Sequence, residues 1–170
     1  MKTALMIPLF FLCLNPGGII LSPEILIYES LDEVLRDYQG PCLLVFFSTS
    51  CQVCWEDLFD MRYFVQKNRI EVKLCGISRE PLKELQIFIE KYSIDFPVVN
   101  DLKGILYKKF QVDLEPFKLI LIKESVLYRD SYYDNKATNQ VRIKKVLMRF
   151  ENKLFESIWD QMRSSGFLVS

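Results

Sequence analysis

An apolar run at residues 42–47, CLLVFF, constrains the fold of this chain more than any other feature. Six consecutive apolar residues leave no polar face, which is typical of a strand buried on both sides. Strands of that kind occur mainly in parallel sheets whose two faces are covered by helices. The run therefore predicts the central strand of an α/β fold.

The rest of the chain continues this pattern. We expect strands at 25–28, 42–47, 70–77, 96–101, 117–122 and 126–133, and helices at 31–38, 51–68, 81–92, 104–110 and 135–164. Strands that alternate with helices, followed by a hairpin and a long C-terminal helix, predict a three-layer α/β/α sandwich around a mixed sheet. A chain of 170 residues is long enough for one such domain, which we place at 23–170.

Composition excludes several classes of function. The 22 lysines and arginines balance the 22 aspartates and glutamates, and no basic run stands out, so we expect no nucleic-acid binding. The chain has no histidine. Catalysis by a Ser-His-Asp or Cys-His arrangement is therefore excluded.

Residues 1–22 have the layout of an export signal. Lys2 precedes an apolar stretch from Ala4 to Leu14, and the helix-breaking sequence NPGG follows at 15–18. The alternatives are a cleaved signal peptide, an uncleaved membrane anchor and a buried N-terminal element. We expect an extracytoplasmic protein that is periplasmic or secreted, with anchoring to the membrane as the alternative. Cysteines in such a compartment tend to pair.

Cys51 and Cys54 form a C-x-x-C pair where the predicted central strand turns into a helix. The helix N-terminus stabilises a thiolate, and cysteines in such places have a pKa of roughly 3.5 to 7.5. Thiolate is the reactive form, so we predict that Cys51 attacks a disulfide and that Cys54 resolves the mixed disulfide. The redox-active pair then needs no cofactor.

Two other interpretations of the pair are weaker. A zinc site needs four ligands, and without histidine these would have to include Cys42 and Cys75 from separate strands. We therefore predict no metal. A structural staple is also a poor interpretation, because a loop this short restricts little entropy of the unfolded chain.

The segments FFSTSCQVCWED at 46–57, FPVVND at 96–101 and FQVDLEPFKLILI at 110–122 together resemble the thioredoxin superfamily. Within it, the chain is similar to exported ResA/TlpA-like thiol:disulfide oxidoreductases and related redoxins of the AhpC/TSA type. The similarity runs from about Ile25 to Tyr133. It implies a thioredoxin-like fold in which EPLKELQIFIEKYSIDFPVVND, at 80–101, matches the insertion of that subfamily.

The resemblance also implies roles for individual residues. Pro116, rather than the conspicuous Pro97, is the proline that faces the cysteine pair, and its peptide bond should be cis so that a substrate chain can pair with the backbone beside it. Pro97 then only opens a strand. Asp57 falls where many such reductases carry an acid that accepts the proton of Cys54. The alternative is an exposed carboxylate in the first turns of a helix, and Glu56 is a weaker candidate for the acid.

This chain departs from the family at several positions around the pair. Thr49-Ser50 replaces the usual tryptophan, Val53 replaces a frequent proline, and Glu115 precedes the cis-proline. We expect Gln52, Val53, Glu115 and Pro116 to contact the substrate. Val53 retains an N–H that favours the Cys51 thiolate, whereas the charge of Glu115 opposes it.

These features predict an exported thiol:disulfide oxidoreductase that acts as a reductase, with cytochrome c maturation as a role that the resemblance implies. Its partners would be protein thiols or disulfides and a membrane electron donor or acceptor, and we expect a monomer. The alternatives are a non-catalytic interaction module and a peroxiredoxin-like thiol peroxidase. The peroxidase would normally carry a Pro-x-x-x-Thr/Ser-x-x pattern before its cysteine, which is missing before Cys51.

Cys42 and Cys75 fall on two predicted strands that we expect to be parallel neighbours. Their positions predict a separation of roughly 10 to 15 Å along the sheet, too far for a disulfide. We interpret both as small buried apolar residues.

Overall fold

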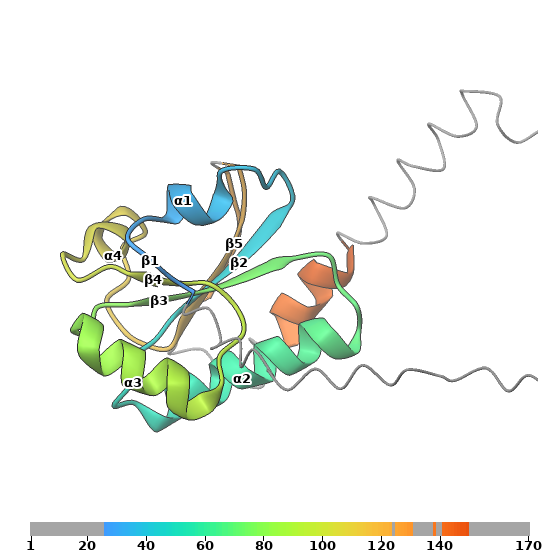
Figure 1. Ribbon diagram of the computed structural model, residues 1–170. Coiled ribbons are helices and arrows are strands. Elements are labelled where there is room, and N and C mark those ends of the chain that lie inside the picture. Colours follow the sequence, from blue (N-terminus) through green and yellow to red (C-terminus); the bar gives the residue numbers. More distant parts are fainter. Residues whose placement is uncertain (1–25, 124, 131–137, 139–140, 150–170) are drawn as a thin grey trace, which may run out of the picture.

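The computed structural model describes residues 26–123, 125–130, 138 and 141–149 (Figure 1). Within these residues, six strands form one sheet in the order β1-β4-β3-β2-β5-β6. The strands are β1 Ile27–Tyr28, β2 Pro41–Phe46, β3 Lys73–Ser78, β4 Val98–Asn100, β5 Phe117–Ile122 and β6 Ser125–Arg129. The helices are α1 Leu31–Leu35, α2 Gln52–Lys67, α3 Leu82–Tyr92 and α4 Ile105–Lys109, and residues 141–149 are also helical.

The sheet is mixed, as predicted. Strands β1, β4, β3 and β2 run parallel, β5 pairs antiparallel with β2, and β6 forms the predicted hairpin with β5. Helices α1 and α4 lie on one face of the sheet, while α2, α3 and the helix at 141–149 lie on the other (Figure 1). The prediction of a three-layer α/β/α sandwich is therefore confirmed.

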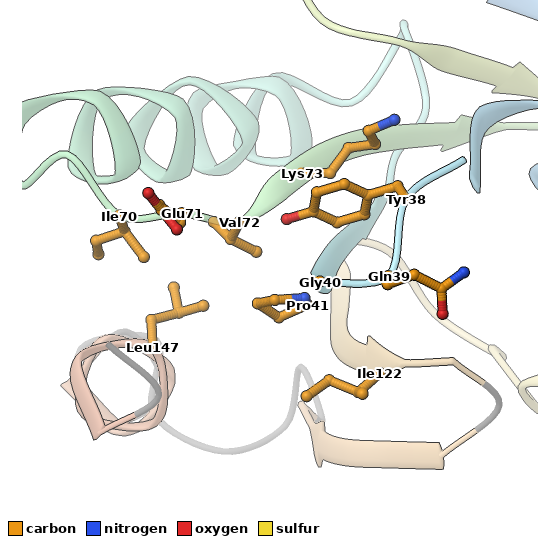
Figure 2. Close-up of a pocket in the computed structure, with 10 residues that line it drawn as sticks. All are labelled: Tyr38, Gln39, Gly40, Pro41, Ile70, Glu71, Val72, Lys73, Ile122 and Leu147. Carbon is orange, nitrogen blue, oxygen red and sulfur yellow. The ribbon is translucent and has the colours of Figure 1, made fainter. Parts of the chain in front are cut away.

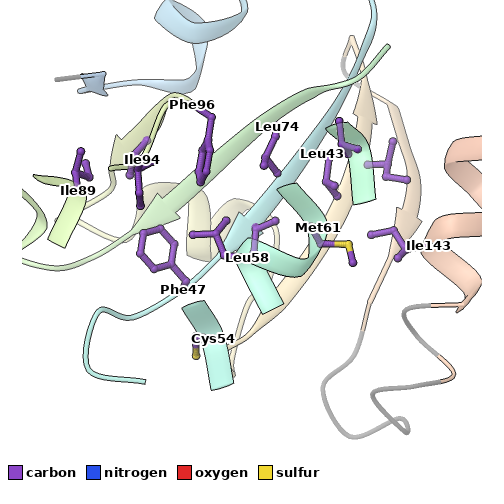
Figure 3. Close-up of a cluster of buried hydrophobic side chains, with 14 of the residues drawn as sticks. Leu43, Phe47, Cys54, Leu58, Met61, Leu74, Ile89, Ile94, Phe96 and Ile143 are labelled. Atoms are coloured by element: carbon purple, nitrogen blue, oxygen red, sulfur yellow. The ribbon is translucent and has the colours of Figure 1, made fainter. Parts of the chain in front are cut away.

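The core has two parts, one on each face of the sheet. Strand β2 is buried along its whole length, with Leu43 and Val45 facing α2 and with Leu44 and Phe46 facing α1 and α4. Figure 3 shows the larger cluster, in which Cys54 and other residues of α2 pack onto the sheet. Each fully buried aliphatic or aromatic side chain contributes about 1.5–3 kcal/mol through burial. This packing fixes α2, and hence the cysteine pair, relative to the sheet.

Several element boundaries differ from the prediction. Strand β3 begins at Lys73 rather than at Ile70, and α1 ends at Leu35 rather than at Tyr38. Pro81 is the N-cap of α3 and not its first helical residue. The predicted cap of α1 is confirmed, because the Ser30 side chain accepts a hydrogen bond from the Glu33 amide.

Several predictions fall wholly or partly outside the described residues, among them the last three residues of the strand predicted at 126–133. The signal peptide or anchor at 1–22 is another, and so is most of the helix predicted at 135–164. Residues 141–149 of that helix are described and are helical, with Ile143 and Leu147 buried. No helix in the described part of the chain is both long and apolar enough to cross a membrane.

Cys42 and Cys75 lie on neighbouring parallel strands, as predicted, but closer together than predicted. Cys42 pairs with Lys73, and Cys75 pairs with Leu44, so the two cysteines are offset by two residues, or about 7 Å along the strands. The reason is that Lys73, rather than Ile70, lies opposite Cys42, which brings Cys75 opposite Leu44. Both thiols are free and buried. Burial raises the pKa of Cys42 to about 12 and also raises that of Cys75.

Candidate functional site

Cys51 and Cys54 form a disulfide at the start of α2, with their Cα atoms 5.3 Å apart. Cys51 is the N-cap residue in an extended conformation, and its carbonyl accepts hydrogen bonds from the Cys54 and Trp55 amides. Cys51 is half-buried, whereas Cys54 is fully buried. The predicted position of Cys51 at a helix N-terminus is confirmed, and Cys51 is the more exposed residue of the pair.

The loop before Cys51 is held by Glu80. One carboxylate oxygen of Glu80 accepts hydrogen bonds from the Ser48 hydroxyl at 2.5 Å and from the Thr49 amide at 3.1 Å. The side-chain amide of Asn100 donates to the Glu80 carbonyl at 2.7 Å, which ties Glu80 to β4. A polar network thus fixes the loop that carries Thr49-Ser50, one of the departures from the family resemblance. Glu80 was not predicted from the sequence as a site residue.

Pro116 lies at the same end of the central strands as the cysteine pair. Phe46, the last residue of β2, pairs with Phe117, the first residue of β5, so the chain leaves β2 toward Cys51 beside the point where Pro116 leads into β5. The Glu115–Pro116 peptide bond is cis, the isomer that we expected. Pro97 directly precedes β4, and its carbonyl accepts a hydrogen bond from the Gly76 amide, which agrees with its interpretation as a strand-opening proline.

Glu115 is held by two neighbours. Its Oε1 accepts a hydrogen bond from the Tyr107 hydroxyl and lies 3.5 Å from Nη2 of Arg79. The Arg79 guanidinium also stacks on the Tyr107 ring, 4.0 Å from its centroid. Burial, followed by the Glu115 carboxylate, raises the pKa of Tyr107. Because Arg79 partly neutralises Glu115, the repulsion that we expected between Glu115 and the Cys51 thiolate is weakened.

Asp57 is buried, with 1% of its side chain exposed. The alternative of an exposed carboxylate is therefore wrong, because Asp57 lies three residues after Cys54 on the face of α2 that packs onto the sheet. Its carboxylate accepts a hydrogen bond from the Lys118 ammonium, which also lies 2.9 Å from Oδ2 of Asp130. Glu56, the weaker candidate, is exposed and accepts a hydrogen bond from Gln52.

Lys118 and Asp130 were not predicted from the sequence as site residues. A signal for Lys118 was present, since a single lysine interrupts the apolar strand FKLILI at 117–122 and a buried lysine needs a charged partner. Nothing local marked Asp130. Gln52 and Val53, which we expect to contact substrate, are exposed between the two cysteines.

A pocket of about 610 Å³ lies at the other end of the central strands (Figure 2). Its lining includes Pro41 at the start of β2, Lys73 at the start of β3 and Ile122 at the end of β5. The cysteine pair follows the opposite end of β2. The pocket is therefore separate from the cysteine site.

Comparisons with known proteins agree with this geometry. The AhpC/TSA family model matches residues 32–138. A Buchnera aphidicola protein whose name assigns it to the peroxiredoxins, bcp, is 28% identical over 148 residues, which cover 82% of this chain and 88% of the relative.

Several of the similar solved structures are, by their names, thiol-disulfide redox proteins. A secreted Mycobacterium tuberculosis disulfide oxidoreductase homologous to E. coli DsbE has a TM-score of 0.51 and 19% identity, covering 64% of this chain and 83% of its own. DsbF of the same organism has a TM-score of 0.54 and 19% identity, and the match covers 68% of this chain and 84% of DsbF. A Bacteroides fragilis thiol-disulfide oxidoreductase has a TM-score of 0.52 and 18% identity, and the match covers 64% of this chain and 82% of that oxidoreductase. The predicted thioredoxin-like fold is confirmed.

Proposed function

Because the chain belongs to the AhpC/TSA family and is an oxidoreductase with a thioredoxin-like fold, we propose that it exchanges electrons with disulfides of other proteins through Cys51 and Cys54. One observation carries this proposal. The pair forms a disulfide at the N-terminus of α2, in which Cys51 is half-buried and Cys54 is fully buried. That asymmetry suits an attacking and a resolving cysteine.

The proposed reaction is a two-step exchange. The Cys51 thiolate attacks a disulfide of the partner, forms a mixed disulfide and expels the first partner thiolate. Cys54 then gives its proton to Asp57 and attacks Cys51, so that the Cys51–Cys54 bond forms and the second partner thiolate leaves. Two electrons pass to the partner, and no cofactor or metal takes part.

Residues around the pair suit the binding of an extended substrate. Gln52 and Val53 are exposed between the cysteines, and Glu115 and Pro116 lie at the same edge of the sheet. We propose that these four residues contact the substrate chain, with the backbone next to Pro116 offering strand-like hydrogen bonds.

We further propose that the protein works outside the cytoplasm as a monomeric reductase and takes electrons from a membrane donor. The export-like layout of residues 1–22 supports this location. The likeness to a secreted disulfide oxidoreductase homologous to DsbE also agrees with it. Cytochrome c maturation is the proposed pathway, and the reduction potential of the pair decides the direction.

Trapping of a mixed disulfide by variants that each lack one cysteine of the pair tests the proposal. Reduced Cys54→Ala protein should form a stable mixed disulfide with a disulfide-bonded protein such as insulin, while Cys51→Ala should form none. Equal trapping by the two variants, or trapping by neither, would contradict the proposed roles.

Thiol peroxidase activity is the second candidate, which the similarity to the peroxiredoxin bcp favours. A peroxidase would oxidise Cys51 to a sulfenic acid, which Cys54 would condense to the disulfide with release of water. Stopped-flow oxidation of the reduced protein by hydrogen peroxide and by a protein disulfide separates the two activities. We expect the protein disulfide to react faster at equal concentration, and the reverse order would favour the peroxidase.

A further inference from the structure

Three buried charged side chains meet between α2 and the sheet. Lys118 of β5 contacts Asp57 of α2 and lies 2.9 Å from Asp130, which directly follows β6. Their side chains are 4%, 1% and 3% exposed, respectively. The Asp130 amide also donates a hydrogen bond to the Lys118 carbonyl, which fixes Asp130 against β5.

Burying these groups is expensive unless they stabilise one another. A buried ion loses several kcal/mol of hydration, and an ammonium between two carboxylates offsets part of that loss for both acids. When all three are ionised they carry two negative charges and one positive charge. Lys118 is therefore shared, and each aspartate alters how strongly the ammonium stabilises the other.

The cluster lies beside the resolving cysteine. Cys54 and Asp57 are one helical turn apart on the same buried face of α2. Lys118 lies two residues after Pro116, on the strand that leads away from the substrate-contacting edge. Ile143 and Leu147 of the helix at 141–149 pack into the hydrophobic cluster that contains Cys54, and Tyr128 of β6 packs against that hydrophobic cluster.

We propose that Lys118 and Asp130 are positioning residues that set the pH at which Asp57 accepts the proton of Cys54. This inference deepens the proposed function and rests on it. Lys118 stabilises the Asp57 carboxylate, and Asp130 limits that stabilisation by sharing the ammonium. In the resolving step, the Cys54 proton moves to Asp57 as the Cys51–Cys54 bond forms and the bond from Cys51 to the partner breaks. The partner sulfur leaves with the electron pair, and the proton then passes from Asp57 to that thiolate or to water.

The test separates the two steps of the exchange. Reduced full-length protein in a Cys13→Ser background is mixed with the aromatic disulfide DTNB, and the absorbance of the released thiolate is followed across pH. The first release reports the attack of Cys51, and the second release reports the attack of Cys54 on the mixed disulfide. The first phase therefore serves as an internal control for every variant.

Lys118→Met and Asp130→Asn should shift the pH midpoint of the second phase in opposite directions. Lys118→Met should raise the pH midpoint of the second phase by about one unit and slow that phase about tenfold at pH values below the wild-type midpoint, because the carboxylate loses its cation. Asp130→Asn should lower the midpoint, because Lys118 then serves Asp57 alone. Lys118→Arg should keep the wild-type midpoint. The first phase should stay within about twofold throughout.

A matched control is available on the same helix. Asp60→Asn removes the half-exposed partner of Lys144 and should leave both phases unchanged. If Lys118→Met does not fold, the near-isosteric Asp130→Asn variant still tests the proposal. Unchanged midpoints, or shifts of the same sign in the two charge variants, would overturn it.

Asp57→Asn distinguishes this inference from the proposed role of Asp57. That variant should slow the second phase about tenfold at neutral pH, and the rate should then rise with pH as the Cys54 thiol itself ionises. An unchanged second phase would refute Asp57 as the proton acceptor. A slowed second phase in Asp57→Asn, together with unaltered midpoints in Lys118→Met and Asp130→Asn, would refute only the role of Lys118 and Asp130.

Discussion

The Glu80 carboxylate accepts a hydrogen bond from the Thr49 amide at 3.1 Å, although the two residues are 31 positions apart in sequence. The same oxygen accepts a hydrogen bond from the Ser48 hydroxyl. A negative charge is therefore fixed on the loop that ends at Cys51. That charge should disfavour a thiolate on Cys51, while the helix N-terminus favours it.

Glu80→Gln tests this electrostatic opposition. The amide oxygen of glutamine can still accept the Thr49 hydrogen bond, but the negative charge is gone. We expect the thiolate of Cys51 to form at a pH lower by about half a unit, measured by thiolate absorbance near 240 nm. Glu84→Gln, an exposed change on α3, is the control and should leave the midpoint unchanged. A midpoint that stays the same or rises in Glu80→Gln would contradict the prediction.

Val53→Pro tests the helix end itself. Cys51 is the N-cap of α2, and its side chain makes no cap hydrogen bond in the disulfide form. A thiolate at this position can accept a hydrogen bond from the second or third helical amide, that of Val53 or of Cys54. Proline removes the Val53 donor, so thiolate formation should need a pH higher by about half a unit or more.

Gln52→Pro is the matched control for that change. It places proline at the first helical position, where its missing N–H costs least, and keeps the Val53 amide. The thiolate midpoint of this control should stay close to that of the wild type. Equal midpoints in Val53→Pro and wild type, or a lower one in Val53→Pro, would show that this amide does not stabilise the thiolate.

The two buried free cysteines should make stability fall at alkaline pH. Burial raises the pKa of Cys42 from 9.0 to about 12 and also raises that of Cys75, so the folded state keeps protons that the unfolded state loses above about pH 9. The free energy of unfolding should then fall by about 1.4 kcal/mol per pH unit for each thiol. Below the unfolded pKa this contribution is fully present.

Denaturant unfolding between pH 8 and 10 measures this slope. Two variants are compared. Both carry Cys51→Ser and Cys54→Ser, so that this disulfide cannot form or rearrange, and the second variant also carries Cys42→Ala and Cys75→Ala. The second protein should be less stable at pH 8 but lose less stability as the pH rises. Parallel slopes would contradict the burial argument.

Elements whose signals lie close together in the sequence were predicted, whereas contacts between distant residues were not. The strand, the cysteine pair and the helix after it were predictable because their signals lie within a few residues: the apolar run at 42–47, the pair at its end and the helical spacing from Cys54 onward. The sheet pairing of Phe46 with Phe117 then places Pro116 at the edge that the family resemblance indicated.

The charged contacts around the site were not predictable in this way. Lys118 contacts Asp57 across 61 residues, and Glu80 contacts Ser48 across 32. Such pairs depend on the rotation of α2 and on the register of neighbouring strands, which one sequence does not reveal. The burial of Asp57 has the same origin. Only the lone lysine in an apolar strand hinted that a charged partner lies opposite.

The central claim is that Cys51 and Cys54 reduce protein disulfides, and the rate of insulin reduction with dithiothreitol as electron donor tests it most directly. The wild-type chain should accelerate insulin precipitation well above the dithiothreitol background, and Cys51→Ser should return the rate to that background. Cys42→Ser is the matched control, since it changes a buried free thiol on β2, and it should stay active. A wild-type rate at background, or full activity in Cys51→Ser, would contradict the claim.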